Sequence, residues 1–95
     1  MNNKPVVSVN DVVLSQKGHD KGSVLLVVAL KDQGFALVCD GRLRKIEKPK
    51  LKNCMHLQKI GHIKKEDLAR DALSNSEIRK MLMPYRQQPL ESLGR

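Results

Sequence analysis

The alternation of apolar and polar positions predicts a β-rich first part of the chain. Short runs of β-branched and aliphatic residues, separated by turn-forming residues, occur at 11–15, 23–30 and 35–39. Asp40 and Gly41 stand between two extended runs, a pattern that favours a two-residue hairpin and a fourth strand at 42–48. A last strand is expected at 51–57, after Pro49 interrupts the ladder.

The expected hairpin also predicts a register. A direct turn at Asp40-Gly41 places Val38 opposite Leu43 and Phe35 opposite Ile46. The alternation slips at Arg44-Lys45, so we expect a bulge or a sharp bend there. The apolar residues Leu43, Ile46 and Leu51 are expected to anchor the segment while the charged residues between them face outward. Phe35 lies in an apolar run and is expected in the core.

The period of the apolar positions changes after residue 63. Four residues of the segment 64–73 share one helical stripe: Leu68, Ala69, Ala72 and Leu73. Ser74 and Glu77 have capping-box spacing and predict the start of a second helix, which Pro84 is expected to end. Helices this short are marginal alone, so they must dock on the rest of the protein, on RNA or on a partner.

These elements predict a mostly β fold, a small and strongly bent β-barrel with two short C-terminal helices. The expected organisation is a barrel over 1–63, a helical extension over 64–83 and a flexible tail over 84–95. The chain of 95 residues leaves room for one hydrophobic core and no second sizeable one.

The distribution of charge along the chain adds a prediction of function to the predicted fold. The net charge is +8, and the segment 42–65 holds nine basic residues and one acid, so the remainder of the chain is neutral. Such segregation indicates a polyanionic partner, nucleic acid first. The alternative is a basic face that is merely solvated.

The scarcity of aromatic residues bears on the mode of binding. Phe35 and Tyr85 are the two aromatic residues of the chain. Proteins that bind single strands stack bases on several exposed rings, so we expect recognition of structured RNA by shape and backbone. The same scarcity argues against an aromatic cage or a module for Pro-rich peptides.

No metal or catalytic site is expected. Cys39 and Cys54 are too few for a disulfide framework, and no C-x-x-C or H-x-x-x-H spacing indicates zinc. No constellation of nucleophile and base stands out, so we expect neither an enzyme nor a cofactor. The longest apolar run, 24–30, is too short to span a membrane, and the start lacks the features of a signal peptide, so a cytoplasmic location is expected.

The run VVLSQKGHDKGSVLLVV at 12–28 resembles the KOW motif, in which a glycine-centred loop joins two strands. Over 9–62 the chain is similar to the archaeal and eukaryotic ribosomal protein family L-fourteen-e and to small KOW-domain RNA-binding proteins of Gram-positive bacteria. The resemblance rests on four pieces in order: Gly18-His19-Asp20-Lys21-Gly22, Asp40-Gly41-x-Leu43-Arg44, Glu47-x-Pro49-Lys50 and His56-Leu57-Gln58.

This resemblance implies an SH3-like barrel that binds ribosomal RNA of the large subunit without catalysis. The expected RNA-binding residues are Lys17, His19, Lys21, Arg42, Arg44, Lys45, Lys48, Lys50, Lys52, His56 and Lys59. The glycine loop at 17–22 has two interpretations: its amides could form an anion-binding concavity, or its glycines could serve turn geometry alone.

Two departures from the family pattern leave a second function open. His19 stands where relatives often carry Arg, and residues 64–95 extend beyond the motif. The C-terminal helices could cover an open side of the barrel, or dock a ribosomal or other protein. The alternative hypothesis is therefore a KOW-type protein-interaction module on the transcription or translation machinery.

Overall fold

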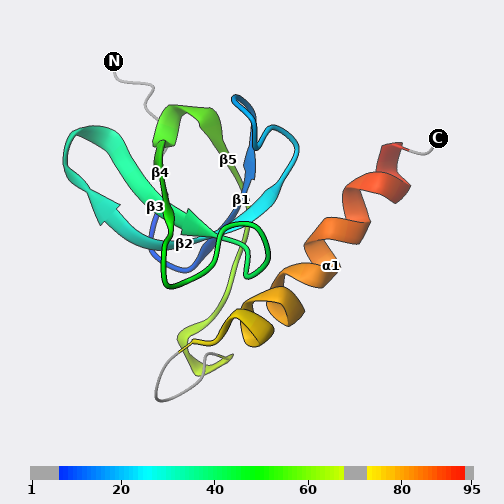
Figure 1. The fold of residues 1–95 in the computed structure, drawn as a ribbon. Coiled ribbons are helices and arrows are strands. Elements are labelled where there is room, and N and C mark those ends of the chain that lie inside the picture. The colour runs from blue at the N-terminus through cyan, green and yellow to red at the C-terminus, as the bar shows by residue number, and fades with distance from the viewer. Residues whose placement is uncertain (1–6, 68–72, 94–95) are drawn as a thin grey trace.

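The fold is a strongly bent antiparallel sheet with one long helix beside it (Figure 1). The computed structural model describes residues 7–67 and 73–93, and the side chains of the helix as far as Arg86. Its elements are β1 (Asp11–Ser15), β2 (Val24–Lys31), β3 (Phe35–Cys39), β4 (Lys50–Asn53), β5 (Leu57–His62) and α1 (Asn75–Leu93). The mostly β class predicted from the sequence is thereby confirmed.

The strands follow the order β4-β3-β2-β1-β5, and each pairs antiparallel with its neighbours. Register shifts occur between Val12 and Val13 against β5 and between Val27 and Ala29 against β3. Such irregularities bend a strand and increase its twist, which allows the sheet to curl. A 3-10 turn at Cys54–His56 joins the two edge strands, but no ladder between β4 and β5 closes the sheet within the described residues.

Alternation along the strands builds two hydrophobic clusters, one on each face of the sheet. The inner cluster contains Val7, Val13, Leu25, Val27, Ala36, Val38 and Leu57. The helix-side cluster contains Val12, Val24, Leu26, Cys39, Ile63, Ile78 and Leu82. Ile78 and Leu82 are fully buried, so α1 is an integral part of the core and covers the outer face of β1 and β2.

The predicted fourth strand at 42–48 is wrong. Residues 40–49 form a loop, and β3 pairs with β4, so that Phe35 lies opposite Asn53 and Val38 opposite Lys50. The local reason is Asp40, whose side chain bonds backbone amides inside the loop and removes them from any ladder.

Three apolar residues lie elsewhere than expected. Leu43 and Leu51 are exposed and therefore anchor nothing in the core. Phe35 is half-exposed, because it occupies the face of β3 opposite to the buried Ala36 and Val38. Of the three expected anchors, Ile46 does pack, against the helix-side cluster.

The C-terminal elements also differ from the prediction. The expected strand at 51–57 is divided by the 3-10 turn, and a 3-10 turn at Lys65–Asp67 stands at the start of the expected first helix. Residues 68–72 of that helix lie outside the described residues. The capping box is confirmed, because the Glu77 amide donates to Ser74 Oγ over 3.1 Å and the Ser74 amide donates to Glu77 Oε1 over 3.2 Å.

Pro84 does not end the second helix, because α1 continues to Leu93. The expected tail over 84–95 is therefore helical as far as Leu93, and residues 94–95 lie outside the described residues. Proline removes one backbone hydrogen bond, but Pro84 lies on the exposed side, while Ile78 and Leu82 hold the preceding turns on the sheet. No helix of the described segments is long and apolar enough to cross a membrane.

Candidate nucleic-acid interface

The loop at 40–49 has a defined shape. Asp40 Oδ1 accepts from the amides of Arg42 and Arg44, at 2.8 and 2.9 Å. The amides of Asp40 and Gly41 in turn donate to the Arg44 carbonyl, at 2.8 and 3.1 Å. Gly41 has a φ of +78°, a conformation that glycine adopts without steric cost. These four bonds fix residues 40–44 as a closed turn.

The first turns of α1 brace this loop from a distant part of the chain. Asn75 Oδ1 accepts from the Ile46 amide at 2.8 Å, and its Nδ2 donates to Glu47 Oε1 at 2.9 Å. Arg79 donates to the Gly41 carbonyl at 2.7 Å. Any side chain on residue 41 would collide with the Asn75 carbonyl oxygen, so the helix approaches as closely as glycine permits.

Beside the turn lies an open hollow of about 450 Å³. Its lining consists of four cations and two apolar residues, with no acid: Leu43, Arg44, Lys45, Lys48, Pro49 and Lys50. Arg42, Lys45 and Lys48 are exposed and form no ion pair within the described parts of the chain. The hollow therefore concentrates positive charge in a concave surface, the arrangement that attracts an anionic ligand.

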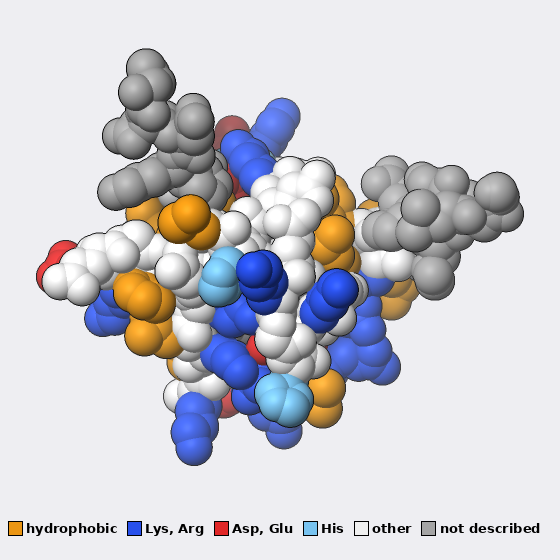
Figure 2. All heavy atoms as spheres, turned by 90° about the horizontal axis from the view of Figure 1, so that it is seen from above, with side chains coloured by type: hydrophobic (Ala, Val, Ile, Leu, Met, Phe, Trp, Pro, Cys, Tyr) orange, Lys and Arg blue, Asp and Glu red, His pale blue; other side chains and the backbone are white. Residues whose placement is uncertain are grey.

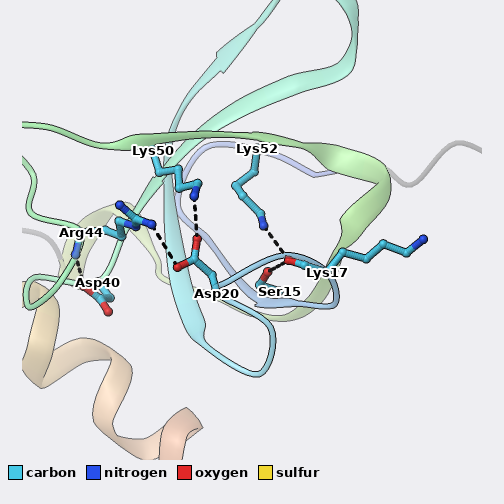
Figure 3. Close-up of polar contacts among 7 residues, drawn as sticks. All are labelled: Ser15, Lys17, Asp20, Asp40, Arg44, Lys50 and Lys52. Atoms are coloured by element: carbon cyan, nitrogen blue, oxygen red, sulfur yellow. Dashed lines mark hydrogen bonds and ion pairs between the residues drawn. The ribbon is translucent and has the colours of Figure 1, made fainter.

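Asp20 holds two of these cations in place (Figure 3). Its carboxylate lies 3.4 Å from the guanidinium of Arg44 and 3.4 Å from the ammonium of Lys50. The Asp20 side chain is 11% exposed, whereas those of Arg44 and Lys50 are about one-third exposed. The acid thus stands behind the cations and orients them, and their outer atoms remain accessible.

Lys52 differs from the other predicted phosphate ligands. It is 8% exposed, and its ammonium donates to the Lys17 carbonyl at 2.9 Å. The Ser15 hydroxyl donates to the same carbonyl at 3.1 Å (Figure 3). The buried ammonium of Lys52 therefore stabilises the β1–β2 loop and is poorly placed to reach a phosphate.

The glycine loop between β1 and β2 is folded onto itself. The amides of Lys21, Gly22 and Ser23 donate to carbonyls of the same loop region, those of Gly18, Ser15 and Asp20. These three amides are consequently not available to form the anion-binding concavity that the sequence allowed. The structure favours the interpretation in which Gly18 and Gly22, both at positive φ, serve turn geometry.

The side chains of this loop nevertheless contribute to a cationic face. Lys17, His19 and Lys21 are exposed, and the Gln16 amide donates to the His56 carbonyl, which brings the loop to the 3-10 turn. Figure 2 shows Lys, Arg and His side chains gathered across the face seen from above. The predicted residues of the two loops and of the turn are thus exposed or half-exposed, whereas Lys52 on β4 is buried.

Lys59 belongs to a separate cluster around Asp11. Asp11 is fully buried and accepts from the Ser8 amide at 2.8 Å and from His62 Nδ1 at 2.7 Å. The ammonium of Lys59 lies 3.5 Å from the same carboxylate, but the side chain is half-exposed. Lys59 can therefore present charge outward while it helps to compensate a buried acid.

The cysteines have the properties of inert thiols. Burial, with the neighbouring charge of Asp40, raises the pKa of Cys39 to about 12, and burial also raises the pKa of Cys54. A thiol with a raised pKa is a poor nucleophile and a poor metal ligand at neutral pH. Within residues 7–67 and the described part of the helix, no group of three or more His, Cys, Asp or Glu could hold a metal ion.

Sequence reasoning missed the residues that shape the interface: Asp20, Asp40, Asn75 and Arg79. Asp40 had a local signal, because Asp before Gly commonly bonds amides two residues on. Asn75 and Arg79 had none, since their contacts lie 29 and 38 residues away along the chain.

Comparison with protein-family models finds no match for this chain, and no curated protein matches it. The similarity to KOW proteins therefore remains a prediction.

Proposed function

We propose that this protein binds structured RNA, with ribosomal RNA of the large subunit as its target, through phosphate contacts from the loop at 40–50. The observation that carries the proposal is the acid-free hollow of about 450 Å³ with its four cationic lining residues. Each phosphate neutralised there releases condensed counterions, which supplies affinity at low salt.

The support for a backbone-binding mode comes from the aromatic residues. Any side chain on Gly61 would collide with the Tyr85 ring, so Tyr85 packs against β5 and is partly buried there. Phe35 is half-exposed on β3, which leaves one ring on that surface. A single ring does not make a platform for successive bases.

The bent five-stranded sheet supports the finer fold that the proposal includes, an SH3-like KOW barrel over 1–63. The short 3-10 link between β4 and β5 brings the ends of the two edge strands together. A KOW barrel bound to ribosomal RNA implies a non-catalytic protein without cofactor, located in the cytoplasm.

The test compares two triple variants with the same loss of charge. Arg42→Gln, Lys45→Gln and Lys48→Gln neutralise exposed residues of the loop, whereas Lys31→Gln, Lys64→Gln and Lys80→Gln neutralise exposed residues outside the hollow. Binding to fragments of large-subunit RNA is measured by filter retention at several salt concentrations. We expect the first variant to lose affinity about tenfold or more and to show a flatter salt dependence.

Equal losses in both variants would mean that net charge acts without a site, and would contradict the proposal. Sucrose-gradient sedimentation of lysate adds the cellular readout. Co-migration with the large subunit at low salt, lost in the loop variant and kept in the control, is expected. A protein that stays at the top of the gradient at every salt concentration would exclude the ribosomal target.

A second candidate, a protein-interaction module on the transcription or translation machinery, is favoured by one surface. Leu37 and Leu51 pair across β3 and β4 on the outer face of the sheet, and Leu51 is 51% exposed. Deleting the helix would expose the core, so the appropriate variant is Leu51→Glu. An association with ribosomes that resists nuclease and is lost in this variant, with RNA affinity intact, would support the second candidate over the first.

A further inference from the structure

Leu43 is an apolar side chain displayed at the most charged point of the surface. It is 87% exposed, the largest exposed fraction among the large hydrophobic residues in the described part of the chain. The next in order, Met55, is 63% exposed. Leu43 follows Arg42, precedes Arg44 and Lys45, and lines the cationic hollow.

The exposure of Leu43 is built into a fixed turn. The amides on both sides of it, those of Arg42 and Arg44, are held by Asp40 Oδ1. Arg79 fixes the Gly41 carbonyl, two residues before Leu43. The backbone therefore cannot fold this side chain inward without breaking these bonds, and the chain accepts a constantly hydrated leucine at this point.

We propose that Leu43 is a wedge that enters an unstacked step of an RNA helix, while the cations around it take the flanking phosphates. This inference rests on the proposed RNA-binding function and narrows its ligand to a helix interrupted by an unpaired nucleotide. In a continuous duplex every base face is covered by stacking. At a bulge a base face or a widened step is open, and an apolar side chain can cover it at low deformation cost.

The geometry favours RNA over an anionic membrane as the occupant. The cations line a hollow, so a convex phosphate backbone can contact several of them, whereas a flat bilayer reaches those at the rim. A single leucine also buries too little apolar area to anchor a protein in a membrane. A membrane is therefore an outcome of the test and not the proposal.

The experiment uses the full chain and two RNA hairpins that differ by one bulged nucleotide, with a fluorescent base analogue beside the bulge. Leu43→Ala removes the wedge, Leu43→Met retains an apolar side chain, and Leu51→Ala is the control at another exposed leucine. We expect Leu43→Ala to lose about tenfold in affinity for the bulged hairpin and to bind the continuous hairpin within about twofold of the original chain. Leu43→Met and Leu51→Ala are expected to bind both hairpins normally.

The fluorescence of the base analogue reports insertion directly. It should rise when the original chain binds and should not change with Leu43→Ala, because unstacking requires the leucine. Thermal unfolding of the two Leu43 variants should match that of the original chain, since Leu43 makes little contact with the protein.

Failure of this inference is distinguishable from failure of the proposed function. If the triple cation variant loses RNA binding but Leu43→Ala binds the bulged hairpin normally, the wedge is wrong and RNA binding stands. If neither changes the affinity, both are wrong. The original chain could instead bind phosphatidylglycerol vesicles, with Leu43→Ala abolishing that binding and leaving the RNA affinity unchanged. That result would show that Leu43 contacts a membrane and would contradict its insertion into RNA.

Discussion

The two cationic loops of this protein achieve their shape in different ways. The backbone of the β1–β2 loop, residues 16–23, is closed mainly by hydrogen bonds among its own groups. Contacts from elsewhere in the sheet and from the second loop join it to the rest of the protein, and they come from Arg44, Lys50, Lys52, His56 and Gln58. The loop at 40–49 is closed by Asp40 but positioned by Asn75 and Arg79 of α1. The backbone closure of the first loop is local, whereas the second loop depends on a helix whose contacting residues follow it by 29 and 38 positions.

This difference shows how a charged segment can be made rigid. Neighbouring lysines and arginines repel one another, so a free loop of this composition would spread apart. The helix supplies the Asn75 amide and the Arg79 guanidinium, which hold the loop backbone while the charged side chains of the loop remain exposed. The loop thereby presents its cations in one arrangement and loses less conformational entropy on binding.

The largest effect should come from breaking the contact between the helix and the loop at residue 41. Gly41→Ala adds a methyl group that collides with Asn75, at a φ of +78°, so we expect a loss of about 2–4 kcal/mol in unfolding free energy. RNA affinity should fall as well. Gly22→Ala is the matched control in the other loop, with a φ of +90° and open space around the new methyl group.

Urea unfolding monitored by circular dichroism measures both variants. For Gly22→Ala we expect a loss of about 1 kcal/mol in unfolding free energy, which is the cost of the positive φ alone. Equal losses in the two variants would show that the approach of the helix does not constrain residue 41.

Removing the side chain of Asn75 should have the next largest effect. Asn75→Ala leaves the Ile46 amide and Glu47 without their partner, and we expect a loss of about 1–3 kcal/mol in unfolding free energy. Backbone NMR shifts should change over 44–48 and remain constant over 16–23. The control is Gln58→Ala, which removes an exposed bond to Gln16 and should cost less than about 0.5 kcal/mol. Shift changes in both loops would contradict the separation.

The third prediction concerns the buried lysine that supports the β1–β2 loop from β4. Lys52→Met removes the ammonium that donates to the Lys17 carbonyl, and we expect a loss of about 1 kcal/mol in unfolding free energy, measured by urea unfolding. RNA affinity should stay within about twofold, because a buried ammonium contributes little to a phosphate contact. Lys45→Met removes an exposed charge of the hollow, so it should lower the RNA affinity and leave the unfolding free energy nearly unchanged. A large loss of RNA affinity in Lys52→Met would contradict this prediction and would show that Lys52 contributes to RNA binding.

The smallest effect should be a pH dependence confined to the loop at 40–49. The hydrogen bond from Asn75 lowers the pKa of Glu47 from its ordinary value of 4.5. A lowered pKa in the folded state means that the stabilisation is complete above 4.5 and is lost as the pH falls below it. The Asn75 side-chain amide signals should therefore titrate with a midpoint below 4.5, and Glu47→Gln should abolish this titration. A midpoint above 4.5 would contradict the bond.

The predictable part of this molecule is the part determined by local patterns. The apolar runs at 11–15, 23–30 and 35–39 became β1, β2 and β3 within a residue, because alternation and β-branched content are properties of each segment alone. The Ser74–Glu77 capping box was found for the same reason. Most of the predicted cationic residues are exposed, as charge clustering implied.

The rest depended on partners that a linear pattern does not reveal. Asp40-Gly41 carries the local signal of a tight hairpin, but the Asp40 side chain bonds the amides of Arg42 and Arg44. Asn75, from the helix, holds the Ile46 amide, so the segment after Gly41 forms a loop and not a strand. Pro84 carries the signal of a helix end, but packing of the preceding turn outweighs it. The burial of Lys52 could not be seen either, since a lysine on a strand is ordinarily exposed.

The position of the brace at the C-terminal end of the chain has a consequence for the order of events during synthesis. All cations of the loop are made before Asn75 and Arg79. During synthesis the cations of the loop are therefore present before the helix residues that give the loop its shape. The strands can form as they emerge, but the turn around Leu43 becomes fixed only when the helix has been added, so the proposed binding surface takes its shape after Asn75 and Arg79 have been made.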